Sequence, residues 1–198
     1  MKITVIGAGA IGIVLAASLD NKNEVSVLVK PENYKRLIKK GLWIIEGNKK
    51  RKIKAKIVTE VIDSEIVLIA VKGYDLQNTK KLLDSFTGKV IICQNGLKML
   101  DFRLSNDNEI YSIVTSIGAT SSEIGVSEFK GTGKTVVGGL FNVKKDSKEI
   151  LELFSSYFFD ISQSKDIKKE IWLKAAINSA INPIASYYNL KNGELKKS

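Results

Sequence analysis

Short apolar runs alternate with helix-like segments over the first hundred residues of the chain. Four runs, each β-branched and almost entirely apolar, lie at residues 2–6, 24–29, 66–71 and 89–93. Strands buried on both faces of a parallel sheet have this composition. Helical patterns lie between them at residues 10–19, 31–39 and 75–86. This alternation is typical of βαβ units and predicts an α/β fold with a doubly wound parallel sheet.

The remaining segments are assigned from the same patterns. Residues 43–45 and 53–57 form either a hairpin or one strand with an insertion, and the basic run at 49–52 is expected in the solvated turn between them. Further on, a strand is predicted at residues 111–116, a helix at 148–159, a short strand from Ile161 and a long helix at 167–187. We therefore expect a first domain over residues 1–164 and the start of an all-helical second domain over residues 165–198.

Composition narrows the chemistry. The 198 residues contain no histidine and one cysteine, Cys93, at the end of an apolar run. An imidazole base and an intramolecular disulfide are thus excluded, no metal site is expected, and Cys93 is interpreted as a buried thiol. The apolar start at residues 3–6 leads into glycines and not into a signal-peptide cleavage site, and no run is long enough to span a membrane. We expect a cytoplasmic protein with no membrane partner.

The net charge of +10 does not by itself indicate a nucleic-acid partner. The lysines are scattered through the chain and are not concentrated in one segment with interleaved aromatic residues. We expect no nucleic-acid partner. A positive field would still favour an anionic cofactor or substrate.

A glycine-rich turn follows the first predicted strand and opens the first helix. In the run Gly7-Ala8-Gly9-Ala10-Ile11-Gly12, Gly7 permits a tight turn, Gly9 lets the backbone approach a pyrophosphate, and Gly12 allows close helix packing. Backbone N–H groups at the start of the helix, around Ala10 and Ile11, face the phosphates in such sites. This context predicts a Rossmann-type dinucleotide-binding domain.

Three polar residues at predicted strand ends extend this site. Lys30 follows the second strand, where an acidic residue would bind the ribose of NAD, so a cation there favours NADP(H). Lys72 and Asn95 follow the next two core strands, at the sheet edge where open α/β folds bind ligands.

The last helix carries a polar stripe through an apolar sequence. Lys174, Asn178 and Asn182 are spaced by four residues and therefore lie on one helix face. The stripe is either the solvent-exposed face of the helix or a site that faces a ligand, since burying it without partners would be costly.

The motifs GAGAIG, VKGYD, QNG and IWLKAAINSAINPIASYYNLKNGEL, in this order and spacing, resemble the 2-dehydropantoate 2-reductase (ketopantoate reductase) family. The resemblance spans nearly the whole chain and implies NADPH-dependent reduction of 2-dehydropantoate to pantoate, on the route to pantothenate and coenzyme A. It also implies that Lys174 is the general acid that protonates the ketone oxygen. Lys72 is expected to lower the proton affinity of Lys174.

The resemblance assigns further roles. Asn178 and Asn182 match residues that line the substrate site, and Asn95 matches a position that contacts both cofactor and substrate. Asn192, in the NGEL run, is assigned to the substrate as well. Lys30 matches a basic residue that binds the 2′-phosphate, and Lys72 a residue near the cofactor.

Members of that family continue beyond the position that matches Ser198, so the chain is interpreted as short at its C-terminus. The apolar residues of the last helix then need cover, for which we expect a homodimer. Two alternatives stay open: a non-catalytic NADP(H)-binding remnant that serves as an oligomeric sensor, and a reductase of another 2-keto acid.

Overall fold

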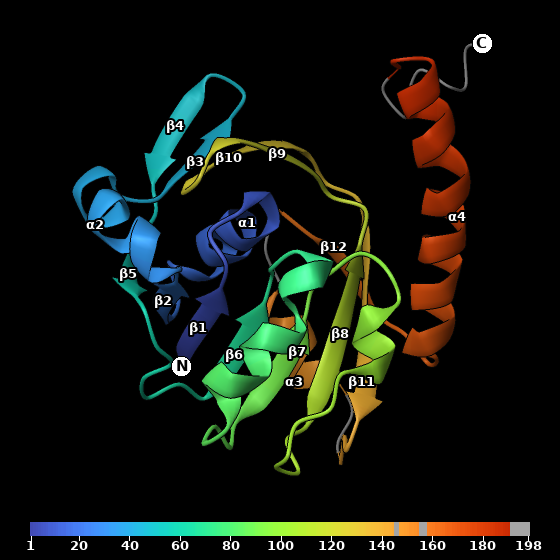
Figure 1. The fold of residues 1–198 in the computed structure, drawn as a ribbon, viewed down its shortest axis with the longest axis horizontal. Coiled ribbons are helices and arrows are strands. Elements are labelled where there is room, and N and C mark those ends of the chain that lie inside the picture. The colour runs from blue at the N-terminus through green and yellow to red at the C-terminus, as the bar shows by residue number, and fades with distance from the viewer. Residues whose placement is uncertain (145–146, 155–157, 191–198) are drawn as a thin grey trace.

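The structure of the protein is a computed structural model that describes residues 1–144, 147–154 and 158–190. Within them, the strands form an eight-stranded and a four-stranded sheet (Figure 1). The strands are β1 (Lys2–Ile6), β2 (Glu24–Leu28), β3 (Trp43–Glu46), β4 (Lys49–Lys52), β5 (Ala55–Val58), β6 (Ile66–Ile69), β7 (Lys89–Ile92), β8 (Ile110–Thr115), β9 (Gly118–Glu123), β10 (Val126–Gly131), β11 (Lys134–Phe141) and β12 (Asp160–Gln163). The helices are α1 (Ala10–Leu19), α2 (Pro31–Lys40), η1 (Gly73–Asp75), η2 (Gln77–Leu83), η3 (Lys98–Asp101), α3 (Lys148–Leu153) and α4 (Ile167–Tyr187).

The large sheet has the strand order β12-β11-β8-β7-β6-β1-β2-β5. Its pairs are parallel except for β11 with β8, which is antiparallel. The chain builds β2 and β5 on one side of β1 and then returns to build β6, β7 and β8 on the other side. This reversal next to β1 creates a crevice at the carboxyl ends of the strands, which is where open α/β sheets bind ligands.

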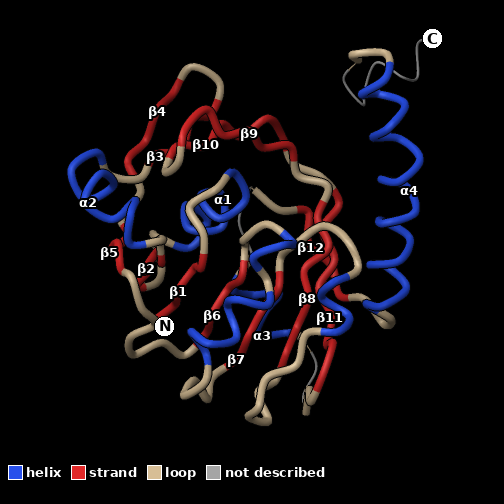
Figure 2. The backbone as a smooth tube through the Cα atoms, viewed as in Figure 1, coloured by secondary structure: helices blue, strands red, loops and turns tan. Residues whose placement is uncertain are grey.

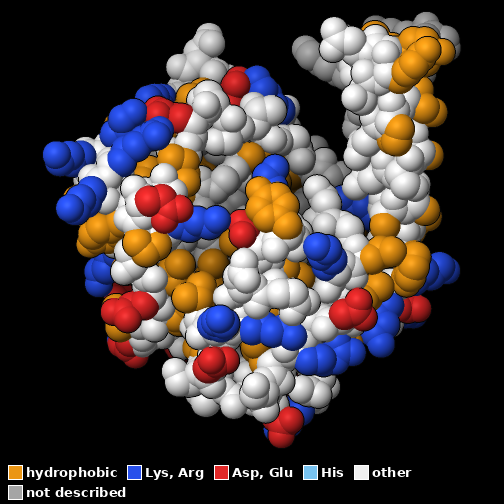
Figure 3. Space-filling view, in the orientation of Figure 1, with side chains coloured by type: hydrophobic (Ala, Val, Ile, Leu, Met, Phe, Trp, Pro, Cys, Tyr) orange, Lys and Arg blue, Asp and Glu red, His pale blue; other side chains and the backbone are white. Residues whose placement is uncertain are grey.

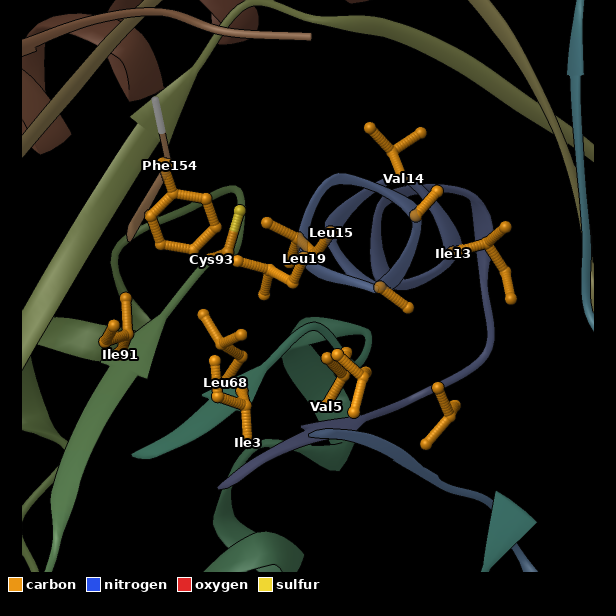
Figure 4. Close-up of a cluster of buried hydrophobic side chains, with 14 of the residues drawn as sticks. Ile3, Val5, Ile13, Val14, Leu15, Leu19, Leu68, Ile91, Cys93 and Phe154 are labelled. Atoms are coloured by element: carbon orange, nitrogen blue, oxygen red, sulfur yellow. The ribbon is translucent and has the colours of Figure 1, made fainter. Parts of the chain in front are cut away.

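Each face of the large sheet has its own apolar core. One core lies under α1 and α3, and Figure 4 shows the α1 residues Leu15 and Leu19 above strand residues such as Val5 and Leu68. The other core lies under η2, η3 and the first turn of α4. The strands of this sheet are apolar at nearly every position because both of their sides are covered.

Helix α1 is enclosed between the two sheets. It contacts β1 and β2 on one side and β3, β9 and β10 on the other, and Figure 2 shows the small sheet lying over it. The small sheet has the order β4-β3-β10-β9. A helix enclosed in this way must be apolar all round, as the sequence AIGIVLAASL is.

Helix α4 contacts the large sheet through its first two turns. Ile167 and Ile171 are buried against β8 and β11, and the rest of the helix stands away from the sheet in Figure 1. Trp172, Tyr187 and Tyr188 are exposed, and Figure 3 shows apolar side chains along the outer edge of this helix. Among the described residues, no helix combines the length and apolarity needed to cross a bilayer.

Two predicted helices are shorter in the structure. The segment predicted as one helix over 75–86 forms the two 3-10 helices η1 and η2. The hydroxyl and the backbone N–H of Thr79 both donate to the carbonyl of Leu76, three residues earlier. Such bonds favour the tighter 3-10 turn over the α-helix. The helix predicted over 148–159 ends at Leu153.

The basic run at residues 49–52 is a strand, so its assignment to the turn is wrong. It forms β4, which pairs with β3 in an antiparallel hairpin, while β5 joins the large sheet beside β2. Arg51 explains why a charged run occupies this place: its guanidinium reaches inward to the fully buried carboxylate of Asp20, 2.7 Å away. Lys50 covers the ring of Trp43.

Candidate functional site

The glycine turn lies where β1 meets α1, beside the end of β6. Gly7 adopts a φ of +111°, which a residue with a side chain rarely takes. A Cβ at Gly12 would lie 2.0 Å from the carbonyl oxygen of Gly7, so only glycine permits this close approach of helix and turn. At Gly9, a Cβ would meet no atom within 4 Å. The structure therefore requires glycine at positions 7 and 12, and it leaves open space in front of Gly9.

A cavity of about 660 Å³ opens in front of this turn, and we call it the glycine-turn cavity. Its walls come from the turn, the ends of β2, β6 and β7, and the 3-10 segment after β6. Of the predicted cofactor residues, it is lined by Gly7, Gly9, Ala10, Ile11, Lys30, Lys72 and Asn95. Gly12 is absent from this lining because it packs against the turn from inside the helix.

The end of this cavity next to β2 carries an ion pair that the sequence did not suggest. The ammonium of Lys30 lies 3.4 Å from a carboxylate oxygen of Asp75, and both residues line the cavity. Lys30 is the residue before α2, and Asp75 ends η1.

A second cavity of about 500 Å³ lies between α4 and the ends of β7, β8 and β11, and we call it the α4 cavity. Lys174, Asn178 and Asn182 all line it. Lys174 and Asn178 are half-buried and Asn182 is exposed, so the stripe both lines this cavity and is open to solvent at its far end. Asn95 lines this cavity too.

Lys174 is held at the sheet end of the α4 cavity. It is half-buried, and its ammonium donates a hydrogen bond to the backbone carbonyl of Thr115 at the end of β8. Burial lowers the pKa of Lys174 below its ordinary value of 10.5, while Cys93 acts weakly in the opposite direction. The expectation that Lys72 lowers this pKa is wrong. Lys72 is not among the causes of the shift, which comes from the loss of hydration around the buried ammonium.

Cys93 is a buried thiol, as predicted. It lies in the apolar cluster with Leu15 and Phe154 (Figure 4). Burial raises its pKa to about 11, against the opposing effect of Lys174. The thiol is therefore protonated at neutral pH and is a poor nucleophile.

The two cavities share one wall, made by Ile11, Cys93, Gln94 and Asn95. Gln94 is buried there and its amide nitrogen donates to the carbonyls of Val71, at 2.8 Å, and Lys72, at 3.3 Å. These bonds tie the end of β7 to the end of β6. A ligand in one cavity would therefore lie beside a ligand in the other, at the residues that line both cavities.

Several lining residues were not anticipated. Glu170 lies one turn before Lys174 on the same face of α4, and the four-residue spacing would have found it. Lys134, at the start of β11, and Ser116 bring polar groups from distant parts of the sequence. No sequence spacing signals these two. Asn192, predicted at the substrate, lies outside the described residues.

Comparison with known proteins identifies the family to which this chain is similar. Residues 3–141 match the family described as ketopantoate reductase PanE/ApbA. A protein of Archaeoglobus fulgidus named 2-dehydropantoate 2-reductase is 28% identical over 199 residues, which cover 100% of this chain and 67% of the relative. The protein of the same name from Pyrococcus abyssi is 30% identical over 205 residues, with 100% and 68% coverage. The chain thus spans about two thirds of the length of these relatives.

Solved structures agree on the fold. D-mandelate dehydrogenase, in a ternary complex with NADH and anilino(oxo)acetate, has a TM-score of 0.85 at 24% identity, covering 100% of this chain and 68% of that one. The predicted Rossmann-type sheet, followed by the helix expected to begin a second domain, is confirmed. With a family match over residues 3–141 and relatives aligned along its whole length, the chain belongs to the ketopantoate reductase PanE/ApbA family of oxidoreductases.

Proposed function

We propose that this protein reduces 2-dehydropantoate to pantoate with NADPH, a step toward pantothenate and coenzyme A. The observation that carries the proposal is that the same four residues line both cavities, which therefore adjoin each other. A half-buried lysine lines one cavity and a dinucleotide-type glycine turn lines the other. Hydride transfer requires the two reactants in contact, and adjoining cavities provide that contact.

The glycine-turn cavity fits a nicotinamide dinucleotide. A side chain at Gly9 would enter open space on the cavity wall, where the backbone is free to approach a pyrophosphate. The N–H groups at the start of α1 would bind the phosphates, and Lys30 would bind the 2′-phosphate of NADPH, with Lys72 near the cofactor. When bound, the reduced nicotinamide supplies the hydride.

In the α4 cavity, Lys174 would donate a proton to the ketone oxygen as carbon 2 is reduced. Its lowered pKa favours this role, because a general acid works best when its pKa is near the operating pH. Its bond to the Thr115 carbonyl holds the ammonium at the strand end. Asn95, Asn178 and Asn182 would hydrogen-bond the substrate.

A 2-keto acid also brings a carboxylate, which needs a cation. Lys134 lines the α4 cavity and is a second lysine there. We infer that it pairs with the substrate carboxylate while Lys174 serves the ketone. Glu170 lines the same cavity and would compete for these cations.

We further propose that the chain is divided into two domains, one for the cofactor and one that contributes to the substrate site. Residues 1–164 would form the cofactor domain, and residues 165–198 would belong to a helical domain that contributes Lys174, Asn178 and Asn182. The limited packing of α4 on the large sheet supports this division. A homodimer that covers the apolar edge of α4 remains a prediction.

A second candidate is reduction of another 2-keto acid. The structural neighbour D-mandelate dehydrogenase, with anilino(oxo)acetate bound, supports it. Ile113, Ile117 and Ile177 give the α4 cavity apolar walls that would accept a bulky side chain. Relative turnover of 2-dehydropantoate and benzoylformate separates the two candidates.

The test is NADPH oxidation with 2-dehydropantoate by the unmodified chain, by Lys174→Met and by Lys169→Met. Lys169 is exposed on α4 and does not line the α4 cavity, so it is the matched control. We expect turnover by the unmodified chain and the control, and a loss of roughly 10²–10⁴-fold in Lys174→Met. Tight NADPH binding without turnover of any 2-keto acid would contradict the proposal and favour a non-catalytic NADP(H)-binding protein.

A further inference from the structure

The Lys30–Asp75 ion pair brings opposite charges to the place where a dinucleotide-binding domain distinguishes its two cofactors. Lys30 follows β2, the strand whose end ordinarily carries the ribose-binding acid of NAD-dependent domains. Asp75 comes from a different element, η1, which follows β6. The two side chains nevertheless meet at 3.4 Å. The acid missing from the end of β2 is therefore supplied by the segment after β6, a strand that β1 separates from β2 in the sheet.

Asp75 has no acidic neighbour in this cavity. Of the described residues that line the glycine-turn cavity, three are charged, namely Lys30, Lys72 and Asp75. The Asp75 side chain is 23% exposed, and that of Lys30 is 62% exposed. The carboxylate is thus the more enclosed member of the pair, and its charge is less screened by water.

The two cofactors differ only in the 2′-phosphate, which carries a charge of about −1.5 to −2 at neutral pH. To bind Lys30, this phosphate must compete with Asp75 for the ammonium and must also approach the carboxylate. NADH has a 2′-hydroxyl instead, and a carboxylate accepts hydrogen bonds from ribose hydroxyls. Lys30 therefore favours NADPH, and Asp75 opposes it.

We propose that Asp75 is a specificity-determining residue that narrows the preference for NADPH over NADH, so that the site accepts both cofactors. This inference rests on the proposed function, because it assumes that the glycine-turn cavity binds the dinucleotide. Asp75 acts in two ways: it neutralises Lys30, and it presents an acceptor to the ribose of NADH.

The experiment measures the dissociation constants of NADPH and NADH by fluorescence titration of the full chain. The unmodified protein is compared with Asp75→Asn, which removes the charge and keeps the shape, and with Asp75→Glu, which keeps the charge. Glu32→Gln is the matched control. Glu32 lies in the first turn of α2, close to Lys30 in sequence, but does not line the cavity.

We expect Asp75→Asn to raise the ratio of the NADH to the NADPH dissociation constant by roughly tenfold, because NADPH binds more tightly and NADH does not. Asp75→Glu should keep a ratio close to that of the unmodified protein, and Glu32→Gln should leave the ratio unchanged. Lys30→Met should lower the ratio.

An unchanged ratio in Asp75→Asn would overturn the inference, as would an equal change in Glu32→Gln. A tenfold shift of the ratio without turnover of 2-dehydropantoate would support the inference and contradict the proposed function. Failure of the unmodified chain to bind either dinucleotide would overturn both.

Discussion

Gly9 and Gly12 lie three residues apart in the same turn, but a methyl group added at each would meet different surroundings. At Gly12 the new Cβ would lie 2.0 Å from the Gly7 oxygen and 3.0 Å from the Gly7 carbonyl carbon. Ordinary van der Waals contact begins at 3.4 Å, so the helix would have to move by about 1.4 Å. Because α1 is enclosed between two sheets, it has little room to move.

The energetic cost of Gly12→Ala follows from this collision. Overpacking of a close-packed interior costs about 1–3 kcal/mol, and the contact here is with backbone, so we take the upper end. The better helix propensity of alanine returns at most about 1 kcal/mol. We therefore expect Gly12→Ala to lower the free energy of unfolding by about 2 kcal/mol.

Gly9→Ala is the matched comparison. Gly9 has φ −80° and ψ −173°, an extended conformation that alanine adopts without strain. No atom lies within 4 Å of the added Cβ, so we expect the free energy of unfolding to change by less than about 0.5 kcal/mol. The methyl group would instead separate the backbone from the phosphates. Losing one charge-assisted hydrogen bond costs about 1.5–3 kcal/mol, roughly a 10- to 100-fold loss of NADPH affinity.

Urea unfolding followed by circular dichroism, together with NADPH titration of each folded variant, separates the two effects. A Gly12→Ala protein with the wild-type unfolding midpoint would refute the packing argument. A Gly9→Ala protein that binds NADPH as tightly as the unmodified chain would refute the role of Gly9 in phosphate binding.

Three further predictions follow from other contacts. Arg51→Ala should lower the free energy of unfolding by about 2 kcal/mol, because the buried carboxylate of Asp20 keeps only the Lys54 backbone N–H, at 2.9 Å; an unchanged urea midpoint would contradict this. Lys134→Met should raise KM for the 2-keto acid by roughly tenfold with a smaller effect on kcat, as steady-state kinetics would show, if Lys134 pairs with the carboxylate. The kcat of the unmodified enzyme should fall as pH rises, because Lys174 must be protonated to act, and a pH profile should place the midpoint below 10.5. A midpoint at or above 10.5 would exclude the lowered pKa.

The central strands were predictable because burial on both faces requires nearly continuous apolar runs. The helix over residues 10–19 was predicted with its observed bounds, since the glycine turn fixes its start. The partner of β3 was not predictable from hydrophobicity, because β4 is entirely basic and is anchored by the long-range contact of Arg51 with Asp20. The hydrogen bonds of Thr79 with Leu76 favour the 3-10 form of η2, and a helical period does not reveal them.

The candidate site, too, was predictable only in part. Helical spacing was sufficient to place Lys174 and both asparagines on one face of α4, although only the structure shows that this face lines a cavity. The bond from Lys174 to Thr115 joins residues 59 positions apart. Asp75 meets Lys30 because β2 and β6 flank β1, so the segments that follow them meet at one edge of the sheet; this depends on the order of strands. Such pairings follow from topology and carry no local signature.

In the proposed reaction, a hydride passes from the dinucleotide in the glycine-turn cavity to the ketone carbon in the α4 cavity while Lys174 protonates the oxygen. The most direct measurement is a single turnover with NADPH that carries deuterium at the transferred position of nicotinamide carbon 4. We expect deuterium at carbon 2 of pantoate with the unmodified chain, and greatly slowed transfer with Lys174→Met. Deuterium that stays in the bound cofactor, with 2-dehydropantoate at saturation, would contradict it.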